Sequence, residues 1–258
     1  NYPDYGTSSQ NITDVWVYAN DVSVGCFELP AHIPILAKGS TKLTFSPGIK
    51  VNGMAATRAT YPFYSNVSYQ CNLSPDSAIR INPVFSFSSS SVVTFNEDFE
   101  SAGIIFQKTA GSDTTIEATN RPGEVFLNTQ DPTEVSNYSG VINLDAVQDT
   151  FEIENISAYS LPVNGTYTFL EFNYKTTTPV VVGLKSYYSS KTVIEPLIVL
   201  NPTTAWKKIY VNYTTAVSGN YNATNFRIYF SGVLRTGATS DKVLFDNIKL
   251  IHASTSKK

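Results

Sequence analysis

The sequence predicts an all-β protein built from two sandwiches in series. Tyr (16) and Phe (15) are abundant, and only 15% of the residues are charged, well below the ~25% typical of globular proteins. Apolar residues alternate over short segments that are bounded by turn signals. No window shows sustained apolar residues at the i, i+3, i+4, i+7 spacing of a helix. We therefore expect little helix.

Residues 12–84 predict a small immunoglobulin-like or transthyretin-like sandwich. Roughly seven short strands are expected there, with turns every 8–12 residues. The clearest alternation is I-T-D-V-W-V-Y at residues 12–18, and the last predicted strand of the domain is residues 78–84. The polar residues 1–11 read as an N-terminal tether.

Residues 92–252 predict a jelly-roll sandwich. The Ser-rich run F-S-F-S-S-S-S at residues 85–91 has the composition of a flexible linker and divides the two domains. About 160 residues of short alternating strands follow it, which suits a jelly roll. Residues 253–258 form a short C-terminal tail.

The closing segment V-L-F-D-N-I-K-L-I, residues 243–251, predicts a buried strand that carries an acid. Strict alternation places Leu244, Asp246, Ile248 and Leu250 on one face, which would be the core face. A buried carboxylate is costly unless backbone donors or a cation satisfy it. Asp246 therefore needs a partner.

A second acidic segment, F-N-E-D-F-E at residues 95–100, opens the same domain. As a strand it would place Asn96, Asp98 and Glu100 on one face. If the first and last strands meet, Asp98, Glu100 and Asp246 form a candidate site for a structural calcium ion, which prefers oxygen ligands. The alternative is that these acids cap strand ends and face solvent or a lysine.

Tyr187 and Tyr188 are the candidate ligand-binding residues. They lie in the loop-like stretch K-S-Y-Y-S-S-K, where adjacent rings have less core to fill. Partly exposed tyrosine rings can stack on sugars. The alternative is ordinary sheet packing, which also uses many aromatic residues.

The sequence offers little for catalysis. No nucleophile motif surrounds His32 or His252, and no Gly-rich phosphate loop occurs. Glu171 and Glu195 could form a glycosidase pair, but nothing in their neighbourhoods singles them out, and solvated strand faces are the favoured alternative. We therefore expect a protein that is not an enzyme.

Composition also restricts the partners and the compartment. The net charge is −3, and no basic cluster occurs before Lys257–Lys258, which argues against nucleic acid. No apolar run reaches the ~18 residues of a membrane span. The low charge favours an extracytoplasmic protein. Cys26 and Cys71 fit either a disulfide or two free thiols.

Eight Asn-X-Ser/Thr sequons occur, and in a chain so rich in Asn, Ser and Thr we attribute them to chance. They are Asn11, Asn66, Asn72, Asn137, Asn155, Asn164, Asn212 and Asn222.

Four motifs of the second domain resemble the galactose-binding-domain-like jelly rolls, which include many carbohydrate-binding modules. They are E-D-F-E (97–100), W-K-K-I-Y-V-N-Y (206–213), F-R-I-Y-F (226–230) and L-F-D-N-I-K-L (244–250). The resemblance implies a structural calcium ion held with the help of Glu100 and Asp246, and a glycan as the ligand.

The first domain, with D-V-W-V-Y, F-E-L-P, P-G-I-K-V-N-G and Y-P-F-Y, resembles the N-terminal half of uncharacterised envelope lipoproteins of the Bacteroidetes. This resemblance implies a lipid anchor on a Cys before Asn1 and a location at the outer membrane, on the cell surface or in the periplasm. The resulting hypothesis is a non-catalytic glycan-binding lipoprotein. The alternative is an accessory or structural subunit docked on an outer-membrane transport, secretion or motility complex.

Overall fold

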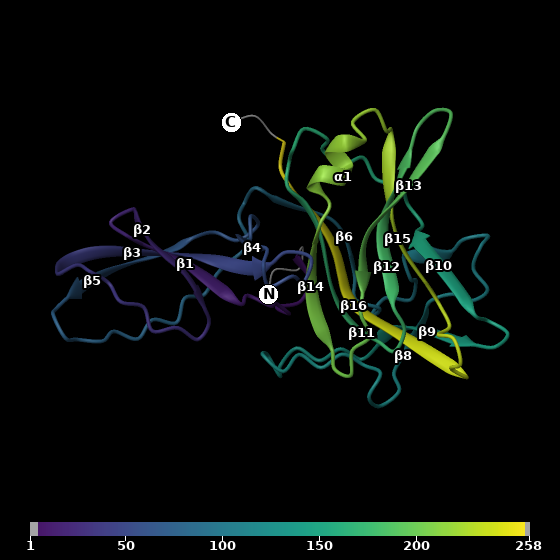
Figure 1. Ribbon diagram of the computed structural model, residues 1–258, viewed down its shortest axis with the longest axis horizontal. Helices are drawn as coiled ribbons and strands as arrows, with labels where there is room; N and C mark the ends of the chain where they lie inside the picture. The colour runs from purple at the N-terminus through teal and green to yellow at the C-terminus, as the bar shows by residue number, and fades with distance from the viewer. Residues whose placement is uncertain (1–4, 256–258) are drawn as a thin grey trace. The chain divides into compact units, whose positions relative to one another are not determined.

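The computed structural model describes residues 5–255 and confirms the all-β prediction (Figure 1). These residues form sixteen strands and one short helix, α1 (Thr214–Gly219). They divide into two compact units. The first unit comprises residues 11–91, and the second comprises residues 92–255 together with residues 5–10. Within the described range, no helix is both long and apolar enough to cross a membrane.

The first unit contains a single antiparallel sheet. Its strands are β1 (Asp14–Ala19), β2 (Val22–Glu28), β3 (Gly39–Lys50), β4 (Arg58–Thr60) and β5 (Val67–Leu73). The long strand β3 is central: β1 pairs with one side of it, and β2 pairs with β1. On its other side, β3 pairs with β5 along its first half and with β4 near its end.

One face of this sheet carries the core of the first unit, and coil rather than a second sheet covers it. The core consists of Val15, Val17, Leu43 and Phe45. Side chains from residues 31–38 and 78–85 pack against it. Residues 78–84, which the alternation predicts as a strand, have no strand pairing in the structure. Pro83 lies in this segment, and a proline has no N–H to give to a ladder.

The predicted linker, residues 85–91, is packed within the first unit. Phe87 forms an isolated β-bridge with Tyr64, and their ring centroids lie 4.7 Å apart. The hydroxyl of Ser91 donates a hydrogen bond to the carbonyl of Phe63 at 3.0 Å. The Ser-rich composition suggests flexibility, but the two phenylalanines and the Ser91 hydroxyl have partners in the fold. The compact units divide directly after Ser91.

The second unit is a sandwich of two antiparallel sheets (Figure 1). The β12 sheet consists, in order, of β13 (Thr192–Leu200), β12 (Val180–Tyr187), β15 (Asn225–Val233), β10 (Thr150–Asn155) and β7 (Phe106–Lys108). The β11 sheet consists of β14 (Lys207–Asn212), β11 (Thr168–Thr176), β16 (Ser240–Ala253), β9 (Ser139–Asp145) and β8 (Glu117–Thr119), with β6 (Ser91–Glu97) paired to β16.

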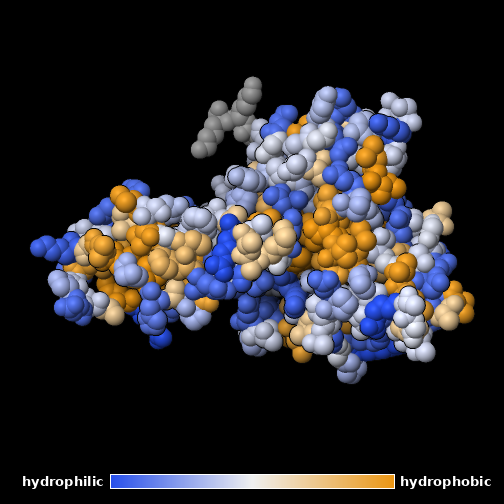
Figure 2. Space-filling view, viewed as in Figure 1, coloured by the Kyte–Doolittle hydropathy of each residue, from blue (hydrophilic) through white to orange (hydrophobic). Residues whose placement is uncertain are grey.

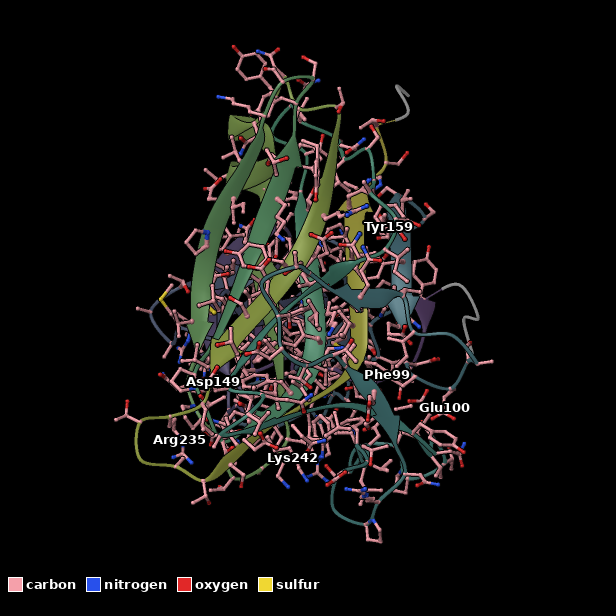
Figure 3. The ribbon with its side chains drawn as sticks, turned by 90° about the vertical axis from the view of Figure 1, so that its right-hand side faces the viewer. Phe99, Glu100, Asp149, Tyr159, Arg235 and Lys242 are labelled. Carbon is pink, nitrogen blue, oxygen red and sulfur yellow. The ribbon has the colours of Figure 1, made fainter. Side chains whose placement is uncertain are left out.

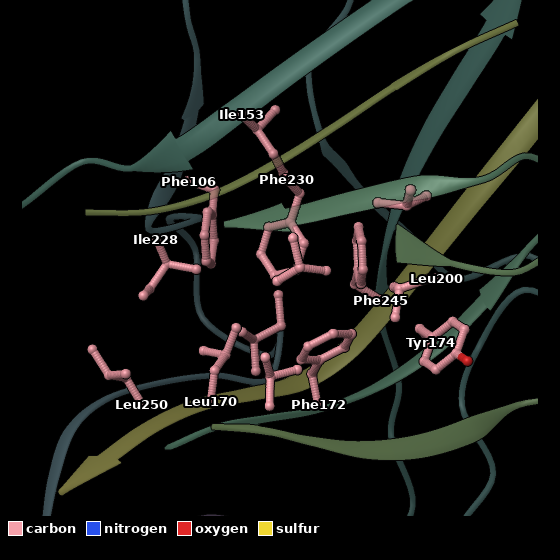
Figure 4. Close-up of a cluster of buried hydrophobic side chains, with 14 of the residues drawn as sticks. Phe106, Ile153, Leu170, Phe172, Tyr174, Leu200, Ile228, Phe230, Phe245 and Leu250 are labelled. Atoms are coloured by element: carbon pink, nitrogen blue, oxygen red, sulfur yellow. The ribbon is translucent and has the colours of Figure 1, made fainter. Parts of the chain in front are cut away.

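Aromatic rings from both sheets fill the space between them (Figure 4). Phe230 of the β12 sheet lies 5.4 Å from Phe172 and 4.6 Å from Phe245, both of the β11 sheet, between ring centroids. All three side chains are fully buried. These contacts hold the two sheets in place and fix which strand faces point outward.

Residues 5–10 lie on the second unit. The hydroxyl of Ser9 donates to Asn173 Oδ1 at 2.9 Å, and that of Thr7 donates to Asn247 Oδ1 at 2.7 Å. The backbone N–H of Ser8 donates to both carboxylate oxygens of Glu134 at 2.8 Å. The polar composition that predicts a tether also supplies these donors, so this part of the segment is bound. Residues 1–4 of the predicted tether and 256–258 of the predicted tail lie outside the described residues.

Cys26 and Cys71 are free thiols in the structure. They lie on β2 and β5, and β1 and β3 separate these two strands. Three inter-strand spacings amount to about 14 Å, twice the largest Cα separation that a disulfide spans. Of the two possibilities left open by the sequence, the structure has free cysteines.

Candidate functional site

The outward face of the β12 sheet carries a cluster of charged and tyrosine side chains. On β10, β12 and β15 the alternate residues Ile153, Leu184 and Phe230 point into the core, so their neighbours point outward. In Figure 3 this sheet faces the viewer. We name these outward side chains the Tyr187 face: Glu152, Glu154, Lys185, Tyr187, Arg227 and Tyr229.

Ion pairs join the charged members of the Tyr187 face. Lys185 Nζ lies 2.7 Å from Glu152 Oε1 and 2.9 Å from Glu154 Oε2. Arg227 Nη1 pairs with the other oxygen of Glu154. Lys185 and Glu154 are almost fully buried by this packing, with side chains only 7% and 9% exposed. Two cations and two anions make the cluster neutral.

The protonation states of the cluster follow from these pairs. Burial by itself would raise the pKa of Glu154, but hydrogen bonds and charges from Lys185 and Arg227 lower it overall. Burial would lower the pKa of Lys185, but Glu152 and Glu154 raise it overall. Both groups therefore stay charged near neutral pH, and the network is a rigid set of donors and acceptors.

The two tyrosines of the face are held against the cations. The guanidinium of Arg227 lies 5.4 Å from the centroid of the Tyr187 ring, and Lys185 Nζ lies 5.5 Å from that of Tyr229. The Tyr229 ring lies against Gly183, where an added Cβ would come within 2.4 Å of it. Gly183 therefore allows the buried Tyr229 ring to approach the backbone.

The structure separates the predicted pair Tyr187 and Tyr188. Tyr187 closes β12 and belongs to the Tyr187 face, whereas Tyr188 begins the following turn. The hydroxyl of Tyr188 donates to Asn220 Oδ1 at 2.7 Å, and Lys191 Nζ lies 5.3 Å from its ring centroid. The two side chains have different neighbours because adjacent strand residues point in opposite directions. They do not form one flat platform.

Asp98 and Glu100 lie at the opening of the second unit, but not on one strand. β6 ends at Glu97, and Phe99 has a φ of 61°, a backbone conformation that breaks the predicted alternation. Phe99 is buried, while Glu100 lies at the periphery (Figure 3). Both acids still line one cavity of about 550 Å³, together with Thr7, Asn128 and Glu134 among others.

Asp246 is fully buried but does not sit in the aliphatic row that the sequence predicts. A register shift in the pairing with β11 and a φ of 51° at Asn247 form an irregularity in β16. As a result Val243 and Phe245, rather than Leu244 and Asp246, point into the core before the irregularity, whereas Ile248 and Leu250 point into it afterwards. The prediction for this face was therefore wrong in its first half.

The partners of Asp246 come from the protein itself. Its Oδ2 accepts a hydrogen bond from the hydroxyl of Ser139 at 2.5 Å, and its Oδ1 accepts one from the backbone N–H of Asn247 at 2.7 Å. Burial, with smaller contributions from the charges of Asp98 and Glu100, raises the pKa of Asp246 to about 7 despite these hydrogen bonds.

The three predicted calcium ligands do not form one ligand set in this arrangement. Glu100 accepts hydrogen bonds from the backbone N–H groups of Asn137 at 2.6 Å and Tyr138 at 3.0 Å. Across residues 5–255, no three His, Cys, Asp or Glu side chains are grouped closely enough to hold a metal ion. These carboxylates bind protein donors here, and calcium stays a prediction.

The conceivable glycosidase pair is separated between the two sheets. Glu171 lies on β11, where Lys249 Nζ is 2.7 Å and Lys208 Nζ is 3.6 Å from its carboxylate. Burial lowers the pKa of Lys208 to about 8, although Glu171 opposes this shift. Glu195 lies on β13, beside Asn220. The two acids are therefore not brought together as a pair.

Sequence reasoning did not single out Glu152, Glu154, Lys185 or Arg227. The segments T-F-E-I-E-N (150–155) and N-F-R-I-Y-F (225–230) each alternate charged or polar residues with core residues. That alternation places the charges on an outward face. Long-range pairing determines which strands lie beside each other. The ion network could therefore not be predicted from either segment alone.

Comparisons with known proteins give a likeness in fold. No family model matches the chain, and no curated protein matches it. Among solved structures, the family 11 carbohydrate-binding module of the Clostridium thermocellum cellulase Lic26A-Cel5E is 13% identical, with a TM-score of 0.40, over 63% of this chain and 95% of the module. The C-terminal family 22 module of C. thermocellum Xyn10B is 14% identical, with a TM-score of 0.41, over 64% and 96%.

A longer fragment of Xyn10B, with the first family 22 module and the xylanase module, also matches. It is 13% identical, with a TM-score of 0.44, over 64% of this chain. The match spans only 29% of that fragment. The similarity to all three concerns fold alone.

Proposed function

We propose that the second unit is a non-catalytic carbohydrate-binding module whose ligand lies on the Tyr187 face. The observation that carries this proposal is the neutral ion network next to a half-buried tyrosine. Sugar recognition needs fixed hydrogen-bonding groups beside a flat aromatic surface. Glu152, Arg227 and the Tyr187 ring provide both within three adjacent strands.

The charge balance of the face supports a neutral glycan. Lys185 and Arg227 are matched by Glu152 and Glu154, so neither an acidic nor a basic sugar would gain a free countercharge. Ile194 of β13 pairs with Lys185 and is 55% exposed. It offers an apolar contact for the non-polar face of a sugar ring beside the polar network.

The test is binding of the full chain to an array of neutral polysaccharides, followed by calorimetry with the best ligand. Tyr187→Ala should weaken binding by at least ~tenfold, equivalent to ~1.4 kcal/mol, because the ring contact is lost. Tyr167→Ala is the matched control, since Tyr167 is 54% exposed and lies outside the face. Tyr188→Ala should weaken glycan binding less than Tyr187→Ala does.

Two results would overturn this assignment. If Tyr187→Ala and Tyr167→Ala bind the glycan equally well, the Tyr187 face is not the site. If no neutral polysaccharide binds, and affinity purification of the intact chain instead returns a stoichiometric outer-membrane protein, the accessory-subunit hypothesis replaces the glycan-binding one.

A further inference from the structure

A cavity of about 490 Å³, lined by aliphatic side chains together with His32, Ser74 and Ser77, lies in the first unit, between the sheet and two coil segments. Its floor is formed by Val17, Leu43 and Phe45. Residues 31–37 and residues 74–81 supply the walls, with Ile35 and Ile79 among them. Figure 2 shows orange, apolar side chains gathered over the first unit. Cavities of this size and apolar lining are typical of binding sites.

The two wall segments resemble strands that lack a neighbour. Burial alternates residue by residue along 31–38 and along 80–85, as it does in a strand. In the described part of the chain, residues 30–38 and 78–85 make no backbone–backbone hydrogen bond. The segments run in opposite directions, because one leads into Gly39 and the other leaves Leu73, and these two residues are paired.

Each of these segments contains a proline that interrupts one of its hydrogen-bonding sides and leaves the other side intact. Successive N–H groups of an extended chain point to alternate sides. Pro34 removes a donor from the even-numbered side of the first segment, and Pro83 removes one from the odd-numbered side of the second. Residues 31, 33, 35 and 37, and residues 78, 80, 82 and 84, retain every N–H.

The charges beside the cavity favour an acidic partner. Lys38 follows the first wall segment directly, and Arg80 lies within the second. Both are exposed, and neither has an ion-pair partner among the residues that the structure describes. Asp76, in the turn at residues 74–77, is the acid nearest to Arg80 in sequence, and Glu28 is the acid nearest to Lys38.

We propose that this cavity binds an extended segment of a partner protein, which adds a strand to the first unit. Aliphatic side chains at every second position of that segment fill the cavity over Leu43 and Phe45. Its backbone pairs with the intact side of at least one wall segment. A carboxylate beside the aliphatic stretch binds Lys38 or Arg80. This is strand addition, in which backbone hydrogen bonds give affinity and alternate side chains give specificity. The proposal does not depend on glycan binding by the second unit.

The experiment selects peptides from a random phage-displayed library against the full chain. We expect the selected peptides to alternate aliphatic residues and to carry an acid at one end. A labelled synthetic copy should protect amides within residues 31–37 or 78–84 from hydrogen exchange. A copy that is N-methylated at alternate backbone positions should bind at least ~tenfold more weakly, because methylation removes the pairing donors.

Two substitutions locate the site and are matched in chemistry. Ile79 lines the cavity and is 49% exposed, so Ile79→Asp should fold and weaken peptide binding at least ~tenfold by placing a charge in the apolar site. Leu36 is fully exposed and does not line the cavity, so Leu36→Asp should bind like the parent. Thermal melts of both variants check folding.

A charge exchange tests the acidic end of the ligand. Lys38→Glu combined with Arg80→Glu should weaken the acidic peptide and favour a copy that carries lysine at the same end. The proposal is overturned by a selection without aliphatic alternation, by equal binding of the N-methylated copy, or by equal binding of the Ile79→Asp and Leu36→Asp variants. A small apolar molecule that binds while no peptide does would also overturn it.

Discussion

The two units of this chain use similar strands and cover their cores differently. In the second unit, the apolar faces of two sheets close on each other, and aromatic rings fill the space between them. In the first unit, one sheet carries a small core of Val15, Val17, Leu43 and Phe45, with coil over it. The second sheet of the second unit leaves little empty space in the core of that unit. Unpaired extended coil leaves a cavity of about 490 Å³.

The difference teaches that alternation alone does not make a sheet. Residues 31–38 and 80–85 have the alternating burial of strands, and their Ile33, Ile35 and Ile81 pack against the core. Pro34 and Pro83 interrupt their hydrogen-bonding edges. Such a layer buries apolar surface without fixing a register, so it can accept a further strand.

The largest effect should come from truncating the same residue type in the two cores. Phe230→Ala should destabilise the second unit by ~3–5 kcal/mol, because the surrounding rings cannot collapse into the space. Phe45→Ala should cost the first unit less, since Phe45 already borders a cavity. Urea unfolding by tryptophan fluorescence can follow each unit, because Trp16 lies in the first and Trp206 in the second.

The control is the parent chain with either tryptophan replaced by Phe, which assigns each transition to its unit. Equal losses of stability in the Phe230→Ala and Phe45→Ala variants would show that the first core is as tightly closed as the second. The comparison between the units would then fail.

A second effect, smaller or similar in size, should come from pH and should be confined to the second unit. The folded pKa of Asp246 is about 7 and the unfolded one is 3.8, so between these values the folded state binds more protons. The stability contributed by protonated Asp246 is therefore fully present below pH 3.8 and is lost as pH rises towards 7. Three pKa units correspond to ~4 kcal/mol at most.

Urea unfolding in a chelating buffer from pH 4 to pH 7.5 measures this slope through Trp206. Asp246→Asn should flatten the slope, because its amide does not titrate. Asp98 and Glu100 contribute to the shift, so Glu100→Gln should reduce the slope slightly. The predicted pH dependence is contradicted if the second unit of the unsubstituted protein does not lose stability above pH 5. Repeating the measurement with calcium in place of chelator tests the predicted cation, which would stabilise the ionised carboxylate and reverse the trend.

The smallest effect should come from partly filling the cavity of the first unit. Ala37 lines it and is half-buried, so Ala37→Val should add apolar contact and raise the stability of the first unit by ~0.5–1 kcal/mol. Unfolding followed by Trp16 fluorescence measures the gain. Ala78→Val, at a more exposed wall position, is the matched control and should give less. A loss of stability in Ala37→Val would mean that the cavity has no room for two methyl groups.

The sequence predicted the strand content from local signals, which need no knowledge of pairing. It did not predict the irregularity at Asn247, because a single positive φ leaves no mark in an alternating segment such as V-L-F-D-N-I-K-L-I. It did not single out Lys185 or Glu154. Lys185 on β12 and Glu154 on β10 form an ion pair across β15, which lies between these strands in the sheet. The sequence of either strand alone does not show that they lie so close together.

The contacts of residues 5–10 determine how the chain would carry force. Ser9 and Thr7 bind Asn173 and Asn247, so the second unit holds a segment that precedes the first unit along the chain as well as residues 92–255, which follow it. The first unit is thus an insert whose two ends both return to the same host. Tension applied between residue 5 and residue 253 would load the hydrogen bonds of the host first. The inserted unit would bear tension only after Thr7 and Ser9 had been pulled from their partners.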